Sequence, residues 1–441
     1  MYNNNISVSQ YLGEDMENWQ KPRKSIFLTG ANFQGDANYK KVAPAPNAAV
    51  VLPPELQRRQ ESESMVYDHL RPMIMVLRIL GIFPIANISK GIYRLTPALM
   101  AYSVFLFALI FGFIGYIKWD KVDFVQSAEG RFEEVVIEYL FTVYLVPIVL
   151  MPLSWLECRR LGMVLMDWGK FEKIYESVES KKLPLFGGNK PLLITLALPI
   201  LSGAIMVVNH ITMVNFKFVQ VVPYCFINMI TFVLGGFWYL HCEVIGSVAT
   251  VLAEDFQQAL KHIGPSTRVA EFRSLWMLLA KITRDVGNGT GYVLICLNLY
   301  LFLIITLTIY GLLSTMQYGF GIKDVGLCGT AAFFVALLYF ICDEAHYASN
   351  CVRVNFQKKL LLVELSWMND DAQQEINMFL RATEMNPTDM SLSGFFDMNR
   401  NLFKSLLATM VTYLVVLLQF QISIPEDMPI PNATITTPAP K

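Results

Sequence analysis

The chain has 441 residues, of which 54% are hydrophobic and only 16% are charged. Soluble proteins of this length carry more charge and less apolar surface, so the composition indicates a membrane protein. The formal net charge of −1 excludes a nucleic-acid-binding protein, because displacing the counterions of a polyphosphate needs clustered Lys and Arg. The seven cysteines stand singly, without the close pairs of a structural zinc site or a small disulfide framework.

The part of the chain before the first long apolar run divides into two segments. Residues 1–64 are rich in Asn, Pro, Gln and charge, so we expect a disordered cytoplasmic N-terminal tail. Its first twenty residues also lack the short apolar core of a removable secretory signal. Within residues 65–94, the apolar stretch 72–85 is too short to span a bilayer. We predict that this segment is amphipathic and lies in the inner membrane interface.

Seven longer apolar runs lie within residues 95–425, and each is long enough to form a membrane helix. Because backbone groups in lipid must pair internally, the sequence predicts an all-α membrane protein with seven transmembrane helices. Two amphipathic segments, 255–285 and 343–404, are predicted to form cytosolic helical extensions that pack into an anchoring bundle. The seven runs are 95–117, 135–156, 192–211, 222–252, 292–316, 325–342 and 406–424.

The distribution of Lys and Arg orients these helices. Most of these residues lie in the N-terminal tail and in the loops on the same side of the membrane, so the N-terminus is predicted to be cytoplasmic and the C-terminus extracellular. Residues 426–441 then form an extracellular C-terminal tail, in which Asn432 begins a glycosylation acceptor triplet. Similar triplets begin at Asn87 and Asn288, but both are predicted to face the cytosol and to stay unmodified.

The last apolar run carries a narrow polar stripe. At ~100° per residue, Ser405, Thr409, Thr412, Gln419 and Ser423 fall within about 40° of one line, and aliphatic residues occupy most of the remaining surface. An amide such as that of Gln419 is costly in hydrocarbon unless it is hydrogen-bonded or hydrated, so this face must meet protein or water. The residues alone leave two interpretations open, a helix-packing face and the lining of a water-filled pore.

Two further groups of residues are candidate sites. Glu426 and Asp427 directly follow the last run and would lie at the outer mouth of such a pore, where carboxylates concentrate cations. A ligand pocket is predicted in the outer halves of helices two to six, because aromatic side chains at that depth can wall a small concave cavity. The same side chains could equally be ordinary core. The pocket candidates are Tyr144, Trp238, Thr306, Tyr310 and Phe334.

No sequence motif indicates an enzyme, a cofactor or a metal centre. The tetrapeptide 343–346 spells a helicase box, but the chain has no glycine-rich loop to hold the phosphates that such a box serves. The motifs of zinc proteases, serine hydrolases and dinucleotide-binding proteins are also absent from the sequence. We therefore expect a protein that acts without catalysis and without a cofactor.

The end of the last apolar run resembles a known family signature. Thr412-Tyr413, five aliphatic residues and Gln419-Phe420 are similar to the T-Y-(five hydrophobic)-Q-F signature of insect gustatory receptors, at the same place in a seven-helix chain. Three longer segments resemble the carbon dioxide receptor subunits of flies and mosquitoes, a branch of that family. These segments are 258–265, 318–327 and 346–390.

The resemblance implies a chemosensory receptor subunit in the plasma membrane of sensory neurons. It implies a ligand-gated, non-selective cation channel, assembled as a homo- or heterotetramer with related gustatory receptor subunits. The last helix would line the central pore, with Gln419 and Phe420 at the gate beside Thr412 and Tyr413. The ligand would be carbon dioxide, although the residues leave open whether dissolved gas, bicarbonate or a proton is the stimulus.

A seven-helix G-protein-coupled chemoreceptor is the alternative from a different class. Three features count against it: the inverted charge bias, which places the N-terminus inside, the confinement of the polar stripe to the last helix, and the lack of an Asp-Arg-Tyr triplet after the third helix.

Overall fold

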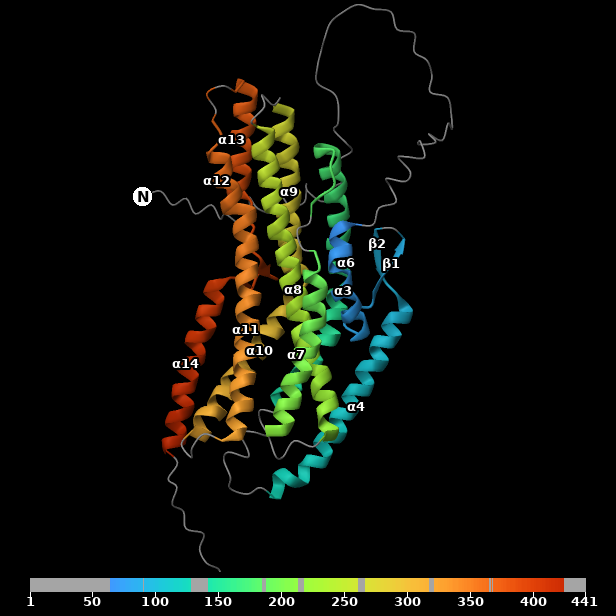
Figure 1. Cartoon of the computed structure of the whole chain (residues 1–441), viewed down its shortest axis with the longest axis vertical. Helices are drawn as coiled ribbons and strands as arrows, with labels where there is room; N and C mark the ends of the chain where they lie inside the picture. Colours follow the sequence, from blue (N-terminus) through green and yellow to red (C-terminus); the bar gives the residue numbers. More distant parts are fainter. Residues whose placement is uncertain are drawn as a thin grey trace, which may run out of the picture. The chain divides into compact units, whose positions relative to one another are not determined.

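The structure is a computed structural model, and it describes residues 64–89, 91–127, 142–184, 188–212, 218–260, 266–316, 321–364, 366 and 368–423. Figure 1 labels the helices and strands in chain order. Predictions for the tails, including Glu426, Asp427 and Asn432, lie outside the described residues. The long helices are α3 (Met65–Ile79), α4 (Pro97–Ser127), α6 (Leu150–Glu179), α7 (Lys190–Thr212), α8 (Phe218–Ala259), α9 (Ser266–Gly289), α10 (Gly291–Met316), α11 (Ile322–Asn350), α13 (Asp370–Met385) and α14 (Arg400–Ser423).

Shorter elements connect these helices. A hairpin of β1 (Ile85–Ser89) and β2 (Ile92–Leu95) precedes α4, and a 3-10 turn, η1 (Val146–Val149), precedes α6. Helix α11 continues through a π-helical turn, η2 (Cys351–Asn355), into α12 (Phe356–Leu361). A second small hairpin, β3 (Ser391–Leu392) and β4 (Phe396–Asp397), stands just before α14.

Six helices of the described residues are long and apolar enough to cross a membrane. They lie in α4, α7, α8, α10, α14 and the continuous run from α11 to α12. The predicted second membrane helix, 135–156, falls partly on residues 128–141 outside the description, and its remainder forms η1 and the start of α6. The predicted all-α membrane fold is confirmed, and these spans are consistent with seven transmembrane helices.

Helix α8 is the central helix of the bundle. It is 42 residues long, and 78% of its most apolar window is buried, against 11% for α4 and for α14. Two adjacent glycines permit close neighbours on different sides. A Cβ at Gly235 would lie 2.8 Å from the side chain of Leu337 on α11, and one at Gly236 would overlap the side chain of Leu198 on α7 and lie 3.1 Å from that of Met73 on α3.

The segment before α4 differs from the prediction. Helix α3 begins at Met65 rather than at residue 72, and it ends at Ile79, just before Gly81 adopts a positive φ of 71°. Its apolar face, which includes Leu70 and Ile74, is buried against α7 and α8. This face therefore meets helices of the same chain. The hairpin β1–β2 has no counterpart in the prediction.

The two amphipathic segments pack against each other. We call α9, α12 and α13, with the ends of α6 and α8 that pack on them, the anchoring bundle. Five aromatic rings fill its core, with centroids 5.3 to 6.4 Å apart. The indole N–H of Trp276 also donates to the carbonyl of Val352 in η2 at 2.8 Å. The five rings are Phe256, Phe272, Trp276, Phe356 and Phe379.

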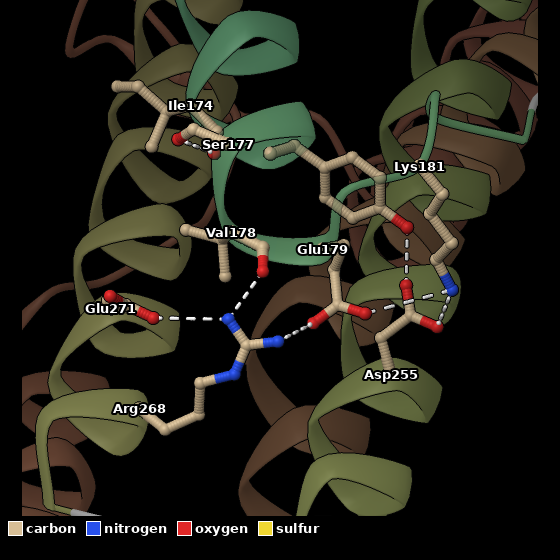
Figure 2. Close-up of polar contacts among 9 residues, drawn as sticks. Ile174, Ser177, Val178, Glu179, Lys181, Asp255, Arg268 and Glu271 are labelled. Atoms are coloured by element: carbon tan, nitrogen blue, oxygen red, sulfur yellow. Dashed lines mark hydrogen bonds and ion pairs between the residues drawn. The ribbon is translucent and has the colours of Figure 1, made fainter.

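Charged side chains tie the end of α6 to α8 and α9 (Figure 2). Lys181 Nζ lies 2.6 Å from Asp255 Oδ1, and the hydroxyl of Tyr175 donates to the same carboxylate. Arg268 of α9 pairs with Glu179 at 3.2 Å and donates to a backbone carbonyl of α6. The anchoring bundle is thus joined by buried aromatic packing and by a partly buried ion-pair network.

Candidate functional site

Helix α14 presents two faces with different surroundings. Met410 and Leu414 are only 2% and 9% exposed, because this face packs against α10 and α11. Leu414 packs with Tyr310 of α10, and the ring of Tyr413 lies 6.0 Å from that of Phe302 in an edge-on contact. The apolar side of the last helix therefore attaches it to the rest of the chain.

The polar stripe lies on the other face. Ser405, Thr409, Thr412 and Gln419 are all exposed, and at ~100° per residue Met410 and Leu414 lie on the opposite side of the helix. The two threonine hydroxyls donate to carbonyls of their own helix, one turn back, at 2.8 and 3.1 Å. These four stripe residues are therefore exposed, whereas the opposite side of α14 is buried against α10 and α11. The side chains of Phe420 and Ser423 lie outside the description.

The start of α14 is fixed in place. Asn399 Oδ1 accepts hydrogen bonds from the backbone N–H groups of Asn401 at 2.9 Å and Leu402 at 3.0 Å, which caps the first turn. Arg400 pairs with Asp343 of α11. The helix that carries the stripe is thus held to α11 at its first turn.

A second candidate site surrounds Phe334 of α11. Its ring centroid lies 5.6 Å from Phe232 of α8, 6.0 Å from Tyr300 of α10 and 6.2 Å from Tyr144. Tyr224 of α8 lies 6.3 Å from Tyr144. All five side chains are buried. The structure therefore brings together two of the five predicted pocket residues, Tyr144 and Phe334.

Polar groups adjoin this aromatic cluster. Asn209 of α7 exchanges hydrogen bonds with Thr330 of α11 at 3.1 and 3.2 Å, and its amide donates to the hydroxyl of Tyr144 at 3.5 Å. The hydroxyl of Tyr300 is buried and has no hydrogen-bond partner among the described residues. A buried hydroxyl without a partner is costly, so a ligand with an acceptor oxygen would stabilise this site.

The other three predicted pocket residues make different contacts. The indole of Trp238 donates to the carbonyl of Ile341 at 3.3 Å, and the hydroxyl of Thr306 donates to Phe302 within α10 at 2.7 Å. Tyr310 packs against α14. Asn209 and Thr330 were not predicted as site residues, although polar residues within apolar helices are themselves a signal of function.

Comparison with known proteins agrees with this architecture. Residues 70–424 match the family model described as 7tm chemosensory receptor. Over 424 residues the chain is 48% identical to gustatory and odorant receptor 24 of Anopheles gambiae, with 92% of this chain and 93% of the relative covered. It is 28% identical to gustatory and odorant receptor 22 of the same species, with 81% and 79% covered. It is also 28% identical to gustatory and odorant receptor 21a of Drosophila melanogaster, with 81% of each chain covered.

Solved structures share the fold. The insect olfactory receptor OR5 of Machilis hrabei superposes with a TM-score of 0.56 at 15% identity, over 80% of this chain and 99% of the receptor. The same receptor in complex with eugenol gives a TM-score of 0.58 at 14% identity, over 80% and 98%. At this identity the likeness concerns the fold.

The fold and the family match define a multi-pass membrane receptor of the insect chemosensory type. The chain belongs to the 7tm chemosensory receptor family, and its relatives are gustatory and odorant receptors. It is therefore a receptor and not an enzyme. The alternative of a G-protein-coupled chemoreceptor is wrong, because both the family match and the fold are those of the insect receptors.

Proposed function

We propose that the chain is a subunit of a ligand-gated, non-selective cation channel whose pore is lined by the polar face of α14. The observation that carries this proposal is the exposure of Thr409, Thr412 and Gln419 opposite the packed face of the same helix. These are the polar side chains of an otherwise apolar helix, so we expect further subunits or water rather than lipid to cover this face. Subunits related by rotation about a central axis would turn it toward water.

The remaining parts of the pore follow from the same assembly. Gln419 and Phe420 form the constriction, and Glu426 and Asp427 lie at the outer mouth, where their charge concentrates cations. We infer a homo- or heterotetramer with related gustatory receptor subunits in the plasma membrane of sensory neurons. This inference rests on the family signature at the end of α14.

Cysteine accessibility tests the pore. Thr412→Cys and Gln419→Cys should be blocked by a water-soluble thiol reagent applied outside during gating, because both side chains would face the pore. Met410→Cys and Leu414→Cys are the matched controls on the buried face and should resist the reagent. Cys328 is exposed, so a Cys328→Ser background removes a competing thiol. Equal block at Leu414, or no block at Gln419 in channels that conduct, would move α14 away from the pore.

We also propose that the cluster around Phe334 binds the stimulus and that this stimulus is carbon dioxide. Two observations support this site, the buried hydroxyl of Tyr300 and the adjoining polar pair from α7 and α11. Carbon dioxide offers two weak acceptor oxygens, which a tyrosine hydroxyl can address. The choice of gas rests on the resemblance of residues 346–390 to carbon dioxide receptor subunits.

Recordings in oocytes test the stimulus and the site together. The chain is expressed with and without related subunits, while dissolved gas and pH are varied independently. Tyr300→Phe removes only the hydroxyl and should lower sensitivity to the gas by about 10-fold, the effect of one lost hydrogen bond at a ligand. Tyr116→Phe is the matched control, since Tyr116 is 64% exposed on α4. Unchanged sensitivity in Tyr300→Phe channels at the surface would place the ligand elsewhere.

A further inference from the structure

Helix α6 holds the first turn of α10 through a buried carboxylate. Glu157 Oε1 accepts a hydrogen bond from the backbone N–H of Tyr292 at 2.8 Å, and Oε2 accepts one from Val293 at 3.2 Å. Glu157 is only 4% exposed. The first N–H groups of a helix have no partner within it and lie at the positive end of its dipole, so a carboxylate there fixes both position and orientation.

The same turn of α10 also receives the hairpin that precedes α14. A Cβ at Gly291 would lie 2.8 Å from the backbone nitrogen of Ser393, so only glycine permits this approach. The rings of Tyr292 and Phe395 lie 6.5 Å apart. Arg160, one turn after Glu157 on α6, donates to the carbonyl of Asn288 at 3.5 Å. Helix α6, the end of α9, the β3–β4 hairpin and α10 therefore meet at one turn.

Two paths lead from this turn to the pore-lining helix. Along the chain, the hairpin ends at Asp397 and α14 begins at Arg400. Through space, α10 packs on α14 through Phe302 against Tyr413 and Tyr310 against Leu414. A displacement of the first turn of α10 must therefore reach α14.

We propose that Glu157 is the positioning residue that couples movement of α6 to the pore helix, acting through the first turn of α10 and the β3–β4 hairpin. This inference rests on the proposed channel function. While the carboxylate holds both N–H groups, α6 and α10 move as one body. When it releases them, α6 shifts without carrying α10 and α14 along.

The local chemistry makes this coupling sensitive to acid. Within the described part of the chain, the charged or titratable groups that face Glu157 are Arg160 and Cys158 on α6 and Cys296 on α10. Burial raises the pKa of Glu157, against the opposing effect of the two backbone hydrogen bonds and of Arg160. On protonation the carboxylate loses its charge and one oxygen becomes a hydroxyl, so the two N–H groups lose their charge-assisted hydrogen bonds and keep one strong acceptor oxygen. Acidification should therefore weaken the coupling.

The same helix supplies a matched control. Glu172 accepts hydrogen bonds from the backbone N–H groups of Met65 at 3.0 Å and Val66 at 2.8 Å, so it caps the first turn of α3 in the same manner. Burial also raises the pKa of Glu172. Helix α3 packs against α7 and α8. The two glutamates share residue type, helix and a carboxylate that accepts from two backbone N–H groups. They differ in the helix that they hold, and Glu172 also accepts a hydrogen bond from the Ser64 hydroxyl at 2.8 Å.

The test compares Glu157→Gln with Glu172→Gln in the full chain, using oocyte currents and surface labelling. Gln keeps the shape of the carboxyl group and, like its protonated form, carries no charge. Glu157→Gln should shift the half-maximal stimulus by about 5-fold or more, the range of an allosteric coupling, and should flatten the dependence on cytosolic pH. Glu172→Gln should leave both within about twofold. Glu157→Asp keeps the charge and should retain the pH dependence. This variant keeps the proposal testable if Glu157→Gln folds poorly.

Hydrogen exchange of the purified chain separates coupling from local structure. Peptides covering 288–296 should exchange faster in Glu157→Gln, and those covering 64–70 should do so only in Glu172→Gln. Faster exchange with unchanged gating in Glu157→Gln would overturn the coupling and leave the cap as a structural contact. A native chain that carries no current with any related subunit would overturn the channel itself, and the coupling with it.

Discussion

The contact between α9 and the β3–β4 hairpin predicts that adding a methyl group at Gly287 lowers the stability of the protein. Gly287 is buried on α9, and a Cβ at this position would lie 2.7 Å from the carbonyl oxygen of Ser391. Because the facing atom belongs to the backbone, the hairpin must move to admit it. Alanine is better than glycine in a helix by about 1 kcal/mol, whereas overpacking costs about 1–3 kcal/mol. Gly287→Ala should therefore lower the free energy of unfolding by up to about 2 kcal/mol.

The same substitution should have the opposite effect where there is room. Gly169 lies on α6, and a Cβ there would meet no atom within 4 Å, so Gly169→Ala should gain about 1 kcal/mol. The assay is thermal unfolding of the detergent-solubilised receptor, followed by the loss of monodisperse protein on size exclusion. Equal stabilisation by the two substitutions would show that the hairpin does not rest on Gly287. Destabilisation by Gly169→Ala would refute the propensity argument.

Two further predictions concern acid stability and topology. Burial raises the pKa of Asp167, but hydrogen bonds from Lys170 and Lys281 outweigh it and hold the pKa below its ordinary value of 3.8. Its contribution to stability is therefore present above that value and is lost as the pH falls through the lowered pKa. In Lys281→Met this loss should begin at higher pH. At neutral pH the free energy of unfolding should change by less than about 1 kcal/mol, because the lysine is exposed. Melting curves recorded against pH would show the shift, and identical profiles for the two proteins would contradict it. For topology, Asn432→Gln should abolish the mass shift on glycosidase treatment, whereas loss of the shift from Asn87→Gln alone would invert the predicted orientation.

The membrane helices could be predicted from the sequence because a lipid bilayer permits few other backbone structures. An apolar run as long as that of α10 must be helical in lipid, and its boundaries agree with the prediction to within one residue. The β3 and β4 strands have two residues each, too few for an alternating pattern to be visible. Helix α3 was placed too late because its first turn, Met65 to Asp68, is capped by Glu172 of α6, which lies more than a hundred residues away.

The candidate site within one helix could be predicted from the sequence, whereas the site assembled from several helices could be predicted only in part. The stripe on α14 repeats with the helical period within one segment, so the residues sufficed to find Thr409 and Thr412. The cluster around Phe334 joins α7, α8, α10 and α11, and Asn209 and Thr330 are 121 residues apart. No local pattern links such residues. The pocket was therefore predicted only in part, from aromatic residues at a suitable depth.

The length of α8 has a mechanical consequence. At ~1.5 Å per residue its unbroken run is roughly 63 Å long, and it carries Tyr224 near one end and Asp255 and Phe256 near the other. If a continuous helix of that length tilts as a rigid body, both of its ends move. With its middle held by α11 on one side and by α7 and α3 on the other at the adjacent glycines, a tilt of ~3° would displace the two ends by ~1.5 Å in opposite directions. Repacking around the aromatic cluster on ligand binding would then tilt α8 about the two glycines and displace its far end within the anchoring bundle.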